Sequence, residues 1–115
     1  MDDNRDSLEM LAAFLSMAGF CVTAVDSAID AVTLNFDNIF AVVTDLSMPG
    51  MDGFEFVRWL HQMHAHRRIS IIAVTGQTVA STAALQRELG CCRVFVKPCD
   101  LDELAKTLDG LLAAA

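Results

Sequence analysis

The stretch Val42-Val43-Thr44-Asp45-Leu46-Ser47-Met48-Pro49-Gly50-Met51-Asp52-Gly53 decides the fold, because it joins a strand to a loop at one acidic residue. The run up to Thr44 is apolar and β-branched, which is typical of a buried strand. Serine, proline and two glycines follow Asp45 and break the chain into a loop. A carboxylate at the end of a buried strand is costly unless it has a partner or a function. In open parallel sheets, ligands bind outside the carboxyl ends of the strands, so Asp45 is the first candidate functional residue.

Helical and strand-like patterns alternate on both sides of this stretch. Before it, we expect a helix capped by Asn4 or Asp6, a strand at 20–25 and a second helix over 27–36. The stretch itself contributes a strand at 40–44. After it, the expected elements are helices at 53–63, 79–89 and 101–112 and strands at 69–75 and 94–96. Continuous apolar strands that alternate with helices predict an α/β fold, with a parallel sheet covered on both faces.

The composition limits the classes of function. A chain of 115 residues fits one domain, and an apolar content of 54% fills one core. The net charge of -7 opposes binding to nucleic-acid phosphates or anionic lipids. The apolar runs fall far short of the ~20 residues that span a bilayer, and the N-terminus is acidic where a signal peptide is basic. We therefore expect residues 1–115 to form a single cytoplasmic domain, without an output domain and with neither a nucleic-acid nor a membrane partner.

The four cysteines do not have the spacing of a metal site. Cys21, Cys91, Cys92 and Cys99 include no pair separated by two residues and no alternation with histidine. We expect buried, reduced thiols, because free cysteine is among the most buried residue types. Metal ligation or oxidation of the vicinal pair Cys91 and Cys92 is the alternative.

Further candidate residues also lie at strand ends. Thr75 ends one expected strand, Lys97 follows the next, and Asp2 and Asp3 stand where a first strand would have ended. Because the carboxyl ends of parallel strands meet at one edge of a sheet, all of them should lie near Asp45. Clustered carboxylates favour a hard divalent cation such as Mg²⁺, while Lys97 and the Thr75 hydroxyl suit an added anionic group. A carboxylate that binds the metal and faces a phosphoryl group is a candidate nucleophile.

Four motifs, taken together and in order, resemble a response-regulator receiver domain. In chain order they are Asp2-Asp3-Asn4, residues 44–53, Ala73-Val74-Thr75-Gly76 and Val96-Lys97-Pro98. The resemblance covers nearly the whole chain except its first strand. It implies a flavodoxin-like, three-layer α/β/α fold with a parallel sheet in the order 2-1-3-4-5.

The resemblance also implies a role for each matching residue. Asp45 would accept a phosphoryl group from a histidine kinase, Thr75 would be the switch hydroxyl, and Lys97 would contact the phosphoryl group. The Mg²⁺ ligands would be Asp3, Asp45, the backbone carbonyl of Ser47 and, through water, Asp2. No enzymatic activity is implied beyond self-phosphorylation from a phosphodonor and slow autodephosphorylation.

The implied partners are proteins of a two-component phosphorelay. A histidine kinase or a histidine phosphotransfer domain would donate the phosphoryl group. A downstream protein would bind the face of the fourth helix, fifth strand and fifth helix of the family, which correspond here to 79–89, 94–96 and 101–112.

The first strand of such a sheet is missing from the sequence. Only Met1 precedes the acids, where about four to six apolar residues are expected. In the order 2-1-3-4-5 the missing strand would lie between those at 20–25 and 40–44. We therefore expect a sequence that is truncated at its start. Two alternatives stay open: the strand at 20–25 closes the gap in a four-stranded sheet, or a second chain fills it.

Two positions depart from the family pattern. The switch aromatic of the family, three residues before the lysine, is Val94 here, and Phe95 should point to the opposite face of its strand. Cys99 follows the Lys-Pro pair where phenylalanine is frequent. The alternative function is therefore a phosphorylation-independent pseudo-receiver that acts as a protein-interaction module. An aspartate-nucleophile phosphatase is disfavoured, because it would need a second carboxylate two residues after the nucleophile, where this chain has Ser47.

Overall fold

The computed structural model of the 115-residue chain describes residues 1–2, 4–46, 53–63, 69–76, 82–97 and 99–114. Its helices are α1 (Arg5–Met17), α2 (Ala28–Ala31), α3 (Gly53–Met63), α4 (Thr82–Leu89) and α5 (Leu101–Ala114). Its strands are β1 (Ala41–Asp45), β2 (Ser70–Thr75) and β3 (Arg93–Val96). Within the described ranges, these strands form a parallel sheet in the order β1-β2-β3. The predicted α/β class with a parallel sheet is confirmed.

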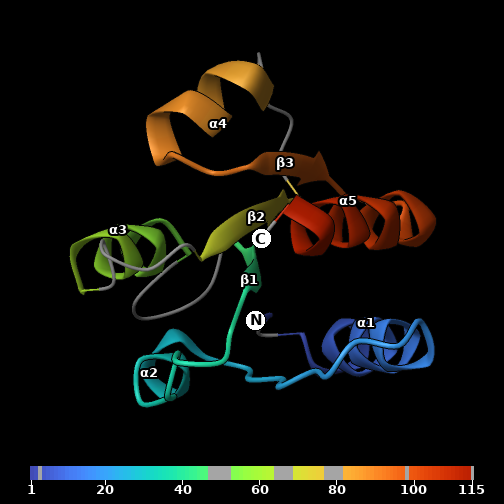
Figure 1. Ribbon diagram of the computed structural model, residues 1–115. Coiled ribbons are helices and arrows are strands. Elements are labelled where there is room, and N and C mark those ends of the chain that lie inside the picture. Colours follow the sequence, from blue (N-terminus) through green and yellow to red (C-terminus); the bar gives the residue numbers. More distant parts are fainter. Residues whose placement is uncertain (3, 47–52, 64–68, 77–81, 98, 115) are drawn as a thin grey trace.

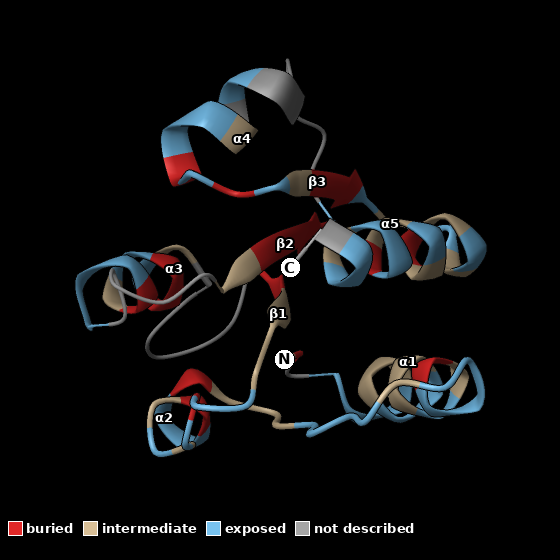
Figure 2. Ribbon diagram, viewed as in Figure 1, coloured by how far each residue is buried: buried red, intermediate tan, exposed pale blue. Residues whose placement is uncertain are grey.

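Helices cover both faces of the sheet, with α1 and α5 on one side and α2 and α3 on the other (Figure 1). The alternation along β2 shows how the two faces are filled. Ile71 and Ala73 belong to the apolar cluster under α2 and α3, whereas Ile72 and Val74 belong to the cluster under α1 and α5. Both faces of the central strand are therefore buried, as Figure 2 shows by colour. No described helix is long and apolar enough to cross a bilayer.

The register of the sheet aligns the carboxyl ends of its strands. Asp45, the last residue of β1, pairs with Val74, and Thr75, the last residue of β2, pairs with Val96. Lys97 comes directly after β3. Three polar residues from three separate strands thus reach one edge of the sheet.

Met1 and Asp2 form a short extended segment beside β1. The ammonium group of Met1 donates to the Val43 carbonyl at 2.6 Å, and the Asp45 N–H donates to the Met1 carbonyl at 2.9 Å. On its other side, the Asp2 N–H donates to the carbonyl of Val25 at 3.3 Å. Burial lowers the pKa of the Met1 ammonium to about 6. The first two residues therefore link β1 to the segment at 20–25.

The prediction of a strand at 20–25 is wrong. This segment contains the apolar and β-branched residues typical of a strand, yet the structure gives it no regular secondary structure. A strand is stable only when a neighbour satisfies its backbone groups, and here the described neighbour is the two-residue segment of Met1 and Asp2. The segment therefore does not close the gap in a four-stranded sheet either.

The second helix is shorter than predicted. Ser27 caps it as expected by accepting from the Asp30 N–H at 3.2 Å, but α2 ends at Ala31 rather than near residue 36. The Thr33 hydroxyl donates to the Asp30 carbonyl, and the Asn35 side chain accepts from the Asp37 N–H. These local side-chain hydrogen bonds compete with a continuing helix.

The remaining elements lie close to their predicted bounds. Asn4, one of the two expected caps, accepts from the Ser7 N–H, and Asp100 accepts from the Glu103 N–H at the start of α5. Helix α4 is described from Thr82, and residues 79–81 of the predicted helix lie outside the described part of the chain.

The expectation of four buried thiols holds only for Cys91. Cys21 and Cys92 are exposed and Cys99 is half-buried, and all four are free thiols. Cys21 belongs to the segment at 20–25, which pairs with none of the three described strands.

Candidate functional site

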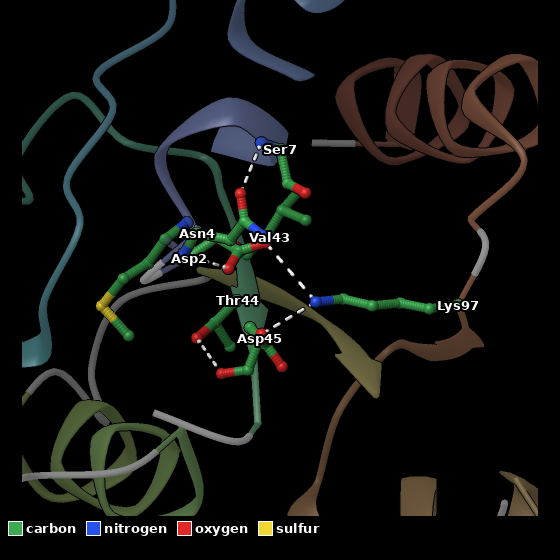
Figure 3. Close-up of polar contacts among 8 residues, drawn as sticks. Asp2, Asn4, Ser7, Val43, Thr44, Asp45 and Lys97 are labelled. Carbon is green, nitrogen blue, oxygen red and sulfur yellow. Dashed lines mark hydrogen bonds and ion pairs between the residues drawn. The ribbon is translucent and has the colours of Figure 1, made fainter. Parts of the chain in front are cut away.

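One ammonium group joins two carboxylates at the edge where the strands end. Lys97 Nζ lies 2.9 Å from Asp45 Oδ2 and 3.6 Å from Asp2 Oδ2 (Figure 3). The three side chains come from the end of β1, the residue after β3 and the extended N-terminal segment. As the sequence predicts, the fold brings Asp2, Asp45 and Lys97 together.

The backbone around Asp45 is fixed on both sides. Its own N–H donates to the Met1 carbonyl, and the next N–H, that of Leu46, donates to the Val74 carbonyl at 3.0 Å. Only 6% of Asp45 is exposed, so its carboxylate has little contact with water. A carboxylate this buried is stabilised by a charged partner such as Lys97. The site therefore presents an acid whose backbone is rigid and whose charge is paired.

The same carboxylates hold Lys97 in its charged form. Burial acts to lower the pKa of Lys97, but the hydrogen bond that Lys97 donates to Asp45 and the charges of Asp2 and Asp45 outweigh burial, so the pKa is raised above its usual value. The side chain is 35% exposed, which leaves its ammonium accessible from solvent. Lys97 therefore carries a positive charge at the solvent-exposed side of the site.

Asp2 is oriented by the start of α1. Its Oδ1 accepts from the Asn4 N–H at 3.0 Å, which leaves Oδ2 directed toward Lys97. Asn4 in turn caps α1 through its bond with the Ser7 N–H at 3.1 Å. The capped start of α1 therefore positions the Asp2 carboxylate.

Thr75 lies at the same edge, on the central strand. It is buried, and its carbonyl accepts from the Lys97 N–H at 2.8 Å. A Cβ atom added at Gly76 would lie 3.7 Å from Lys97 Cδ, so the lysine stem passes over the end of β2. The described site therefore consists of Asp2, Asp45, Thr75 and Lys97.

Two of the predicted metal ligands, Asp3 and Ser47, lie outside the described residues. Within the part of the chain that the structure describes, no group of three histidine, cysteine or acidic side chains is close enough to hold a metal. Asp2 and Asp45 nevertheless approach one common cation, the Lys97 ammonium, through carboxylate oxygens. This oxygen donor pair suits a hard divalent cation.

The switch position has the geometry that the sequence predicts. Val94 packs in the cluster under α2 and α3, whereas Phe95 packs in the opposite cluster beside Leu104. The Arg93 guanidinium lies 4.4 Å from the centroid of the Phe95 ring and holds this aromatic on the α5 side.

Sequence reasoning missed the contribution of Met1. Its backbone, rather than its side chain, pairs with Val43 and Asp45 and places Asp2. The position of Met1 in the sequence could have indicated this contribution, because Met1 directly precedes Asp2 and Asp3, which stand where a first strand was expected to end.

Comparison with known proteins assigns this architecture to a family. Residues 1–109 match the response regulator receiver domain family. The transcriptional regulatory protein GltR of Pseudomonas aeruginosa is 29% identical over all of this chain and 48% of its own length. TctD of Salmonella typhimurium is 30% identical over 96% of this chain and 49% of its own length. The chain thus spans about half the length of these two relatives.

Solved structures agree with the sequence comparison. A receiver domain of a histidine kinase from Syntrophus aciditrophicus superimposes with a TM-score of 0.85 at 27% identity, covering 100% of this chain and 88% of its own. The chemotaxis protein CheY4 of Vibrio cholerae superimposes with a TM-score of 0.82 at 25% identity, covering 96% and 92%. The match of the family over nearly the whole chain, the fold and the order of the strand-end residues lead to one conclusion: the chain belongs to the response regulator receiver domain family of two-component systems.

Proposed function

We propose that this domain accepts a phosphoryl group on Asp45. The observation that carries the proposal is the contact of Lys97 Nζ with Asp45 Oδ2 at 2.9 Å, at the edge where the three strands end. A buried carboxylate whose backbone is fixed and which faces a cation is suited to attack an electrophile that carries negative charge.

The reaction is a transfer of one phosphoryl group between two nucleophiles. A carboxylate oxygen of Asp45 bonds to phosphorus, the bond from phosphorus to the donor breaks, and the donor leaves with that electron pair. The Lys97 ammonium remains beside the new phosphoryl oxygens and offsets their charge. Thr75, at the end of β2, provides a hydroxyl that can donate to the same group. The product is an aspartyl phosphate.

The acids of the site fit a Mg²⁺ ion. We assign its binding to Asp2 through water, to Asp3 and Asp45 directly, and to the backbone carbonyl of Ser47. Such an ion, held by these residues, would supply positive charge beside the phosphoryl oxygens. The approach of Asp2 and Asp45 to one ammonium group supports this assignment.

The test uses a small phosphodonor and intact-protein mass spectrometry. With acetyl phosphate and Mg²⁺, the chain should gain about 80 Da, the mass of one phosphoryl group. Asp45→Asn, a change that keeps the size of the side chain, should abolish the gain. A wild-type chain without added mass, or an Asp45→Asn chain that still gains it, would contradict the proposal.

A second candidate function is a phosphorylation-independent interaction module. The placement of Val94 and Phe95 on opposite faces of β3 favours it, because an aromatic at the switch position is absent. In that case, replacing Asp45 by Asn or Glu would leave the affinity for the partner unchanged. A change in affinity with either substitution would favour the phosphorylated switch.

The partners follow from the family and from charge. We propose a histidine kinase or a histidine phosphotransfer domain as donor, and a downstream protein that binds the face of α4, β3 and α5. The net charge of -7 favours a basic partner surface over nucleic acid or anionic lipid. We further propose that residues 1–115 act as one domain in the cytoplasm, without enzymatic activity beyond self-phosphorylation and slow autodephosphorylation.

A further inference from the structure

A buried hydroxyl lies directly before the proposed phosphoacceptor. Thr44 is 0% exposed, and the three residues of β1 that precede it are an alanine and two valines. A buried hydroxyl loses its hydrogen bonds with water, and this loss is unfavourable unless a partner in the protein replaces them. Valine is β-branched in the same way as threonine and would fill the position without that loss. Packing alone therefore does not explain a hydroxyl at position 44.

The Thr44 hydroxyl has a defined partner in the backbone. Its Oγ1 donates to the carbonyl of Asp45 at 2.9 Å, as Figure 3 shows. Side chains alternate along a strand, so the Thr44 side chain leaves β1 on the opposite face from the Asp45 carboxylate. The hydroxyl therefore acts on Asp45 through the backbone carbonyl and not through the carboxylate.

The peptide unit that contains this carbonyl is also held at its other end. The Leu46 N–H, across the peptide bond from the Asp45 carbonyl, donates to the Val74 carbonyl of β2 at 3.0 Å. A trans peptide directs its carbonyl and its N–H to opposite sides, so the Asp45 carbonyl lies away from β2. The Thr44 hydroxyl and the Val74 carbonyl thus hold the two sides of one rigid plane.

The peptide ahead of Asp45 is fixed as well. Its N–H, that of Asp45, donates to the Met1 carbonyl at 2.9 Å. Because both peptides that flank the Asp45 Cα are held, the Cα–Cβ bond leaves the backbone in one direction. The carboxylate that follows this direction brings Oδ2 to 2.9 Å from Lys97 Nζ. The hydrogen bond from Thr44 restrains the ψ angle of Asp45, and so it restrains the direction of the carboxylate.

We infer that Thr44 is a positioning residue for phosphoryl transfer to Asp45: its hydroxyl holds the following peptide so that the carboxylate keeps its direction toward Lys97. The consequence for reactivity rests on the proposed function, whereas the held peptide does not. Attack on phosphorus requires a carboxylate oxygen roughly in line with the bond that breaks, and a displaced nucleophile reacts more slowly. Loss of the hydroxyl should therefore slow the reaction although Thr44 does not contact the reacting atoms.

Three variants separate the hydroxyl from the packing of the side chain. Thr44→Val keeps the branched shape and removes the donor, whereas Thr44→Ser keeps the donor and removes the methyl group. Val42→Ala removes apolar volume from the same face of the same strand and leaves the hydrogen bond in place. Each chain receives acetyl phosphate and saturating Mg²⁺ at a temperature well below its melting temperature, and mass spectrometry follows the phosphorylated fraction over time.

Thr44→Val should lower the rate constant for phosphorylation about tenfold, because the nucleophile is no longer held in place. Thr44→Ser should react at nearly the wild-type rate, and Val42→Ala should lower the melting temperature without slowing the reaction. A Thr44→Val chain that reacts as fast as wild type would overturn the inference. A Thr44→Ser chain as slow as Thr44→Val, or equal slowing by Val42→Ala, would overturn it too.

A second measurement tests the held peptide without any phosphoryl transfer. Amide hydrogen exchange of Leu46 is compared with that of Ile72, a fully buried residue of β2. The ratio of the Leu46 rate to the Ile72 rate should rise about fivefold in Thr44→Val and stay the same in Thr44→Ser, because the peptide loses one of its two anchors only in the first variant. An unchanged ratio in Thr44→Val would overturn the inference.

The two measurements separate this inference from the proposed function. Slow phosphorylation of Thr44→Val together with faster exchange at Leu46 supports both. A wild-type chain that gains no phosphoryl group overturns the proposed function, and the exchange ratio then decides whether the Thr44 hydroxyl holds the backbone of Asp45. Normal phosphorylation of Thr44→Val leaves the proposed function in place and overturns the role of Thr44.

Discussion

Lys97 is the residue that allows two carboxylates to lie at one sheet edge. Its ammonium contacts Asp45 at 2.9 Å and Asp2 at 3.6 Å, and Asp45 is almost fully buried. Without this cation, two negative groups would share a site with little water to screen them. Much of the electrostatic balance of the site therefore depends on one side chain.

Replacing Lys97 by Met should lower the free energy of unfolding at pH 7 by about 1–2 kcal/mol, a figure reduced to allow for the partial exposure of the lysine. Replacing Lys97 by Arg, which keeps the positive charge, should cause a smaller loss than replacement by Met. Urea denaturation measures both variants, with Lys106→Met on the exposed side of α5 as control. An equal loss in the Met and Arg variants would show that Lys97 acts through packing instead of charge.

The thiols should differ in reactivity according to burial. Burial raises the pKa of Cys91 to about 11, whereas Cys21 and Cys92 are exposed. Since the thiolate is the reactive form, alkylation by iodoacetamide at pH 8 should modify Cys21 and Cys92 first and Cys91 last. Peptide mass spectrometry over a time course gives the order, and early modification of Cys91 in the folded chain would contradict it.

At the residue scale, the sequence was informative where a side chain carries the chemistry. Asp45, Thr75 and Lys97 could be found because each stands at the end of an apolar strand. The part played by Met1 could not be found in this way, because it uses only backbone atoms, which every residue type possesses.

At the scale of elements, the packing of α3 against the C-terminal end of α4 depends on Gly90. This residue has a φ of +67°, a left-handed conformation that follows the end of α4. The His61 ring on α3 bonds to the Leu89 carbonyl at 2.9 Å, and a Cβ atom at Gly90 would lie 3.0 Å from His61 Nε2. A side chain at position 90 would be strained by the positive φ and would contact the His61 ring closely.

Gly90→Ala should therefore lower the free energy of unfolding by about 1–2 kcal/mol. Gly110→Ala is the matched control, since it lies inside α5 with open space around its Cβ position and should stabilise the chain by about 0.5–1 kcal/mol. Chemical denaturation of both variants measures the two effects. Stabilisation by the Gly90 substitution would contradict the account of this junction.

Element prediction succeeded where local pattern and tertiary neighbours agree. The bounds of α3, β2 and α5 follow from apolar periodicity and, for α5, from the capping residue Asp100, because each element also finds its partner in the fold. The segment at 20–25 has an equally clear strand pattern, but the prediction of a strand there was wrong. A strand needs a neighbouring strand to pair with, and the sequence pattern of one segment does not show whether that neighbour exists. The predicted length of α2 was wrong for a local reason, because the hydrogen bonds of the Thr33 and Asn35 side chains compete with a continuing helix.

At the scale of the whole molecule, stability is distributed unevenly across the fold. β2 pairs on both edges and has five buried residues, whereas β1 borders an apolar pocket. This pocket of about 170 Å³ beside β1 leaves its lining side chains with fewer packing partners than those of β2. The hydrogen bonds of Met1 and Asp2 with β1 and with Val25 could not be predicted from the sequence, because they use only backbone atoms.

Amide hydrogen exchange should reproduce this distribution. The amides of β2 should exchange most slowly, since they open only with the whole sheet, and those of residues 20–25 should be among the fastest. Exchange followed by NMR or mass spectrometry tests the order. Slow exchange at 20–25 would show that this segment is paired, contrary to the structure.

The role proposed for Asp45, that of phosphoacceptor at the strand ends of this receiver domain, can be tested by locating the phosphoryl group chemically. The chain is treated with acetyl phosphate and Mg²⁺, the acyl phosphate is reduced by borohydride, and the peptides are sequenced by mass spectrometry. Homoserine is expected at position 45 in the wild-type chain and not in Asp45→Asn. Homoserine at another aspartate, or at none, would contradict it.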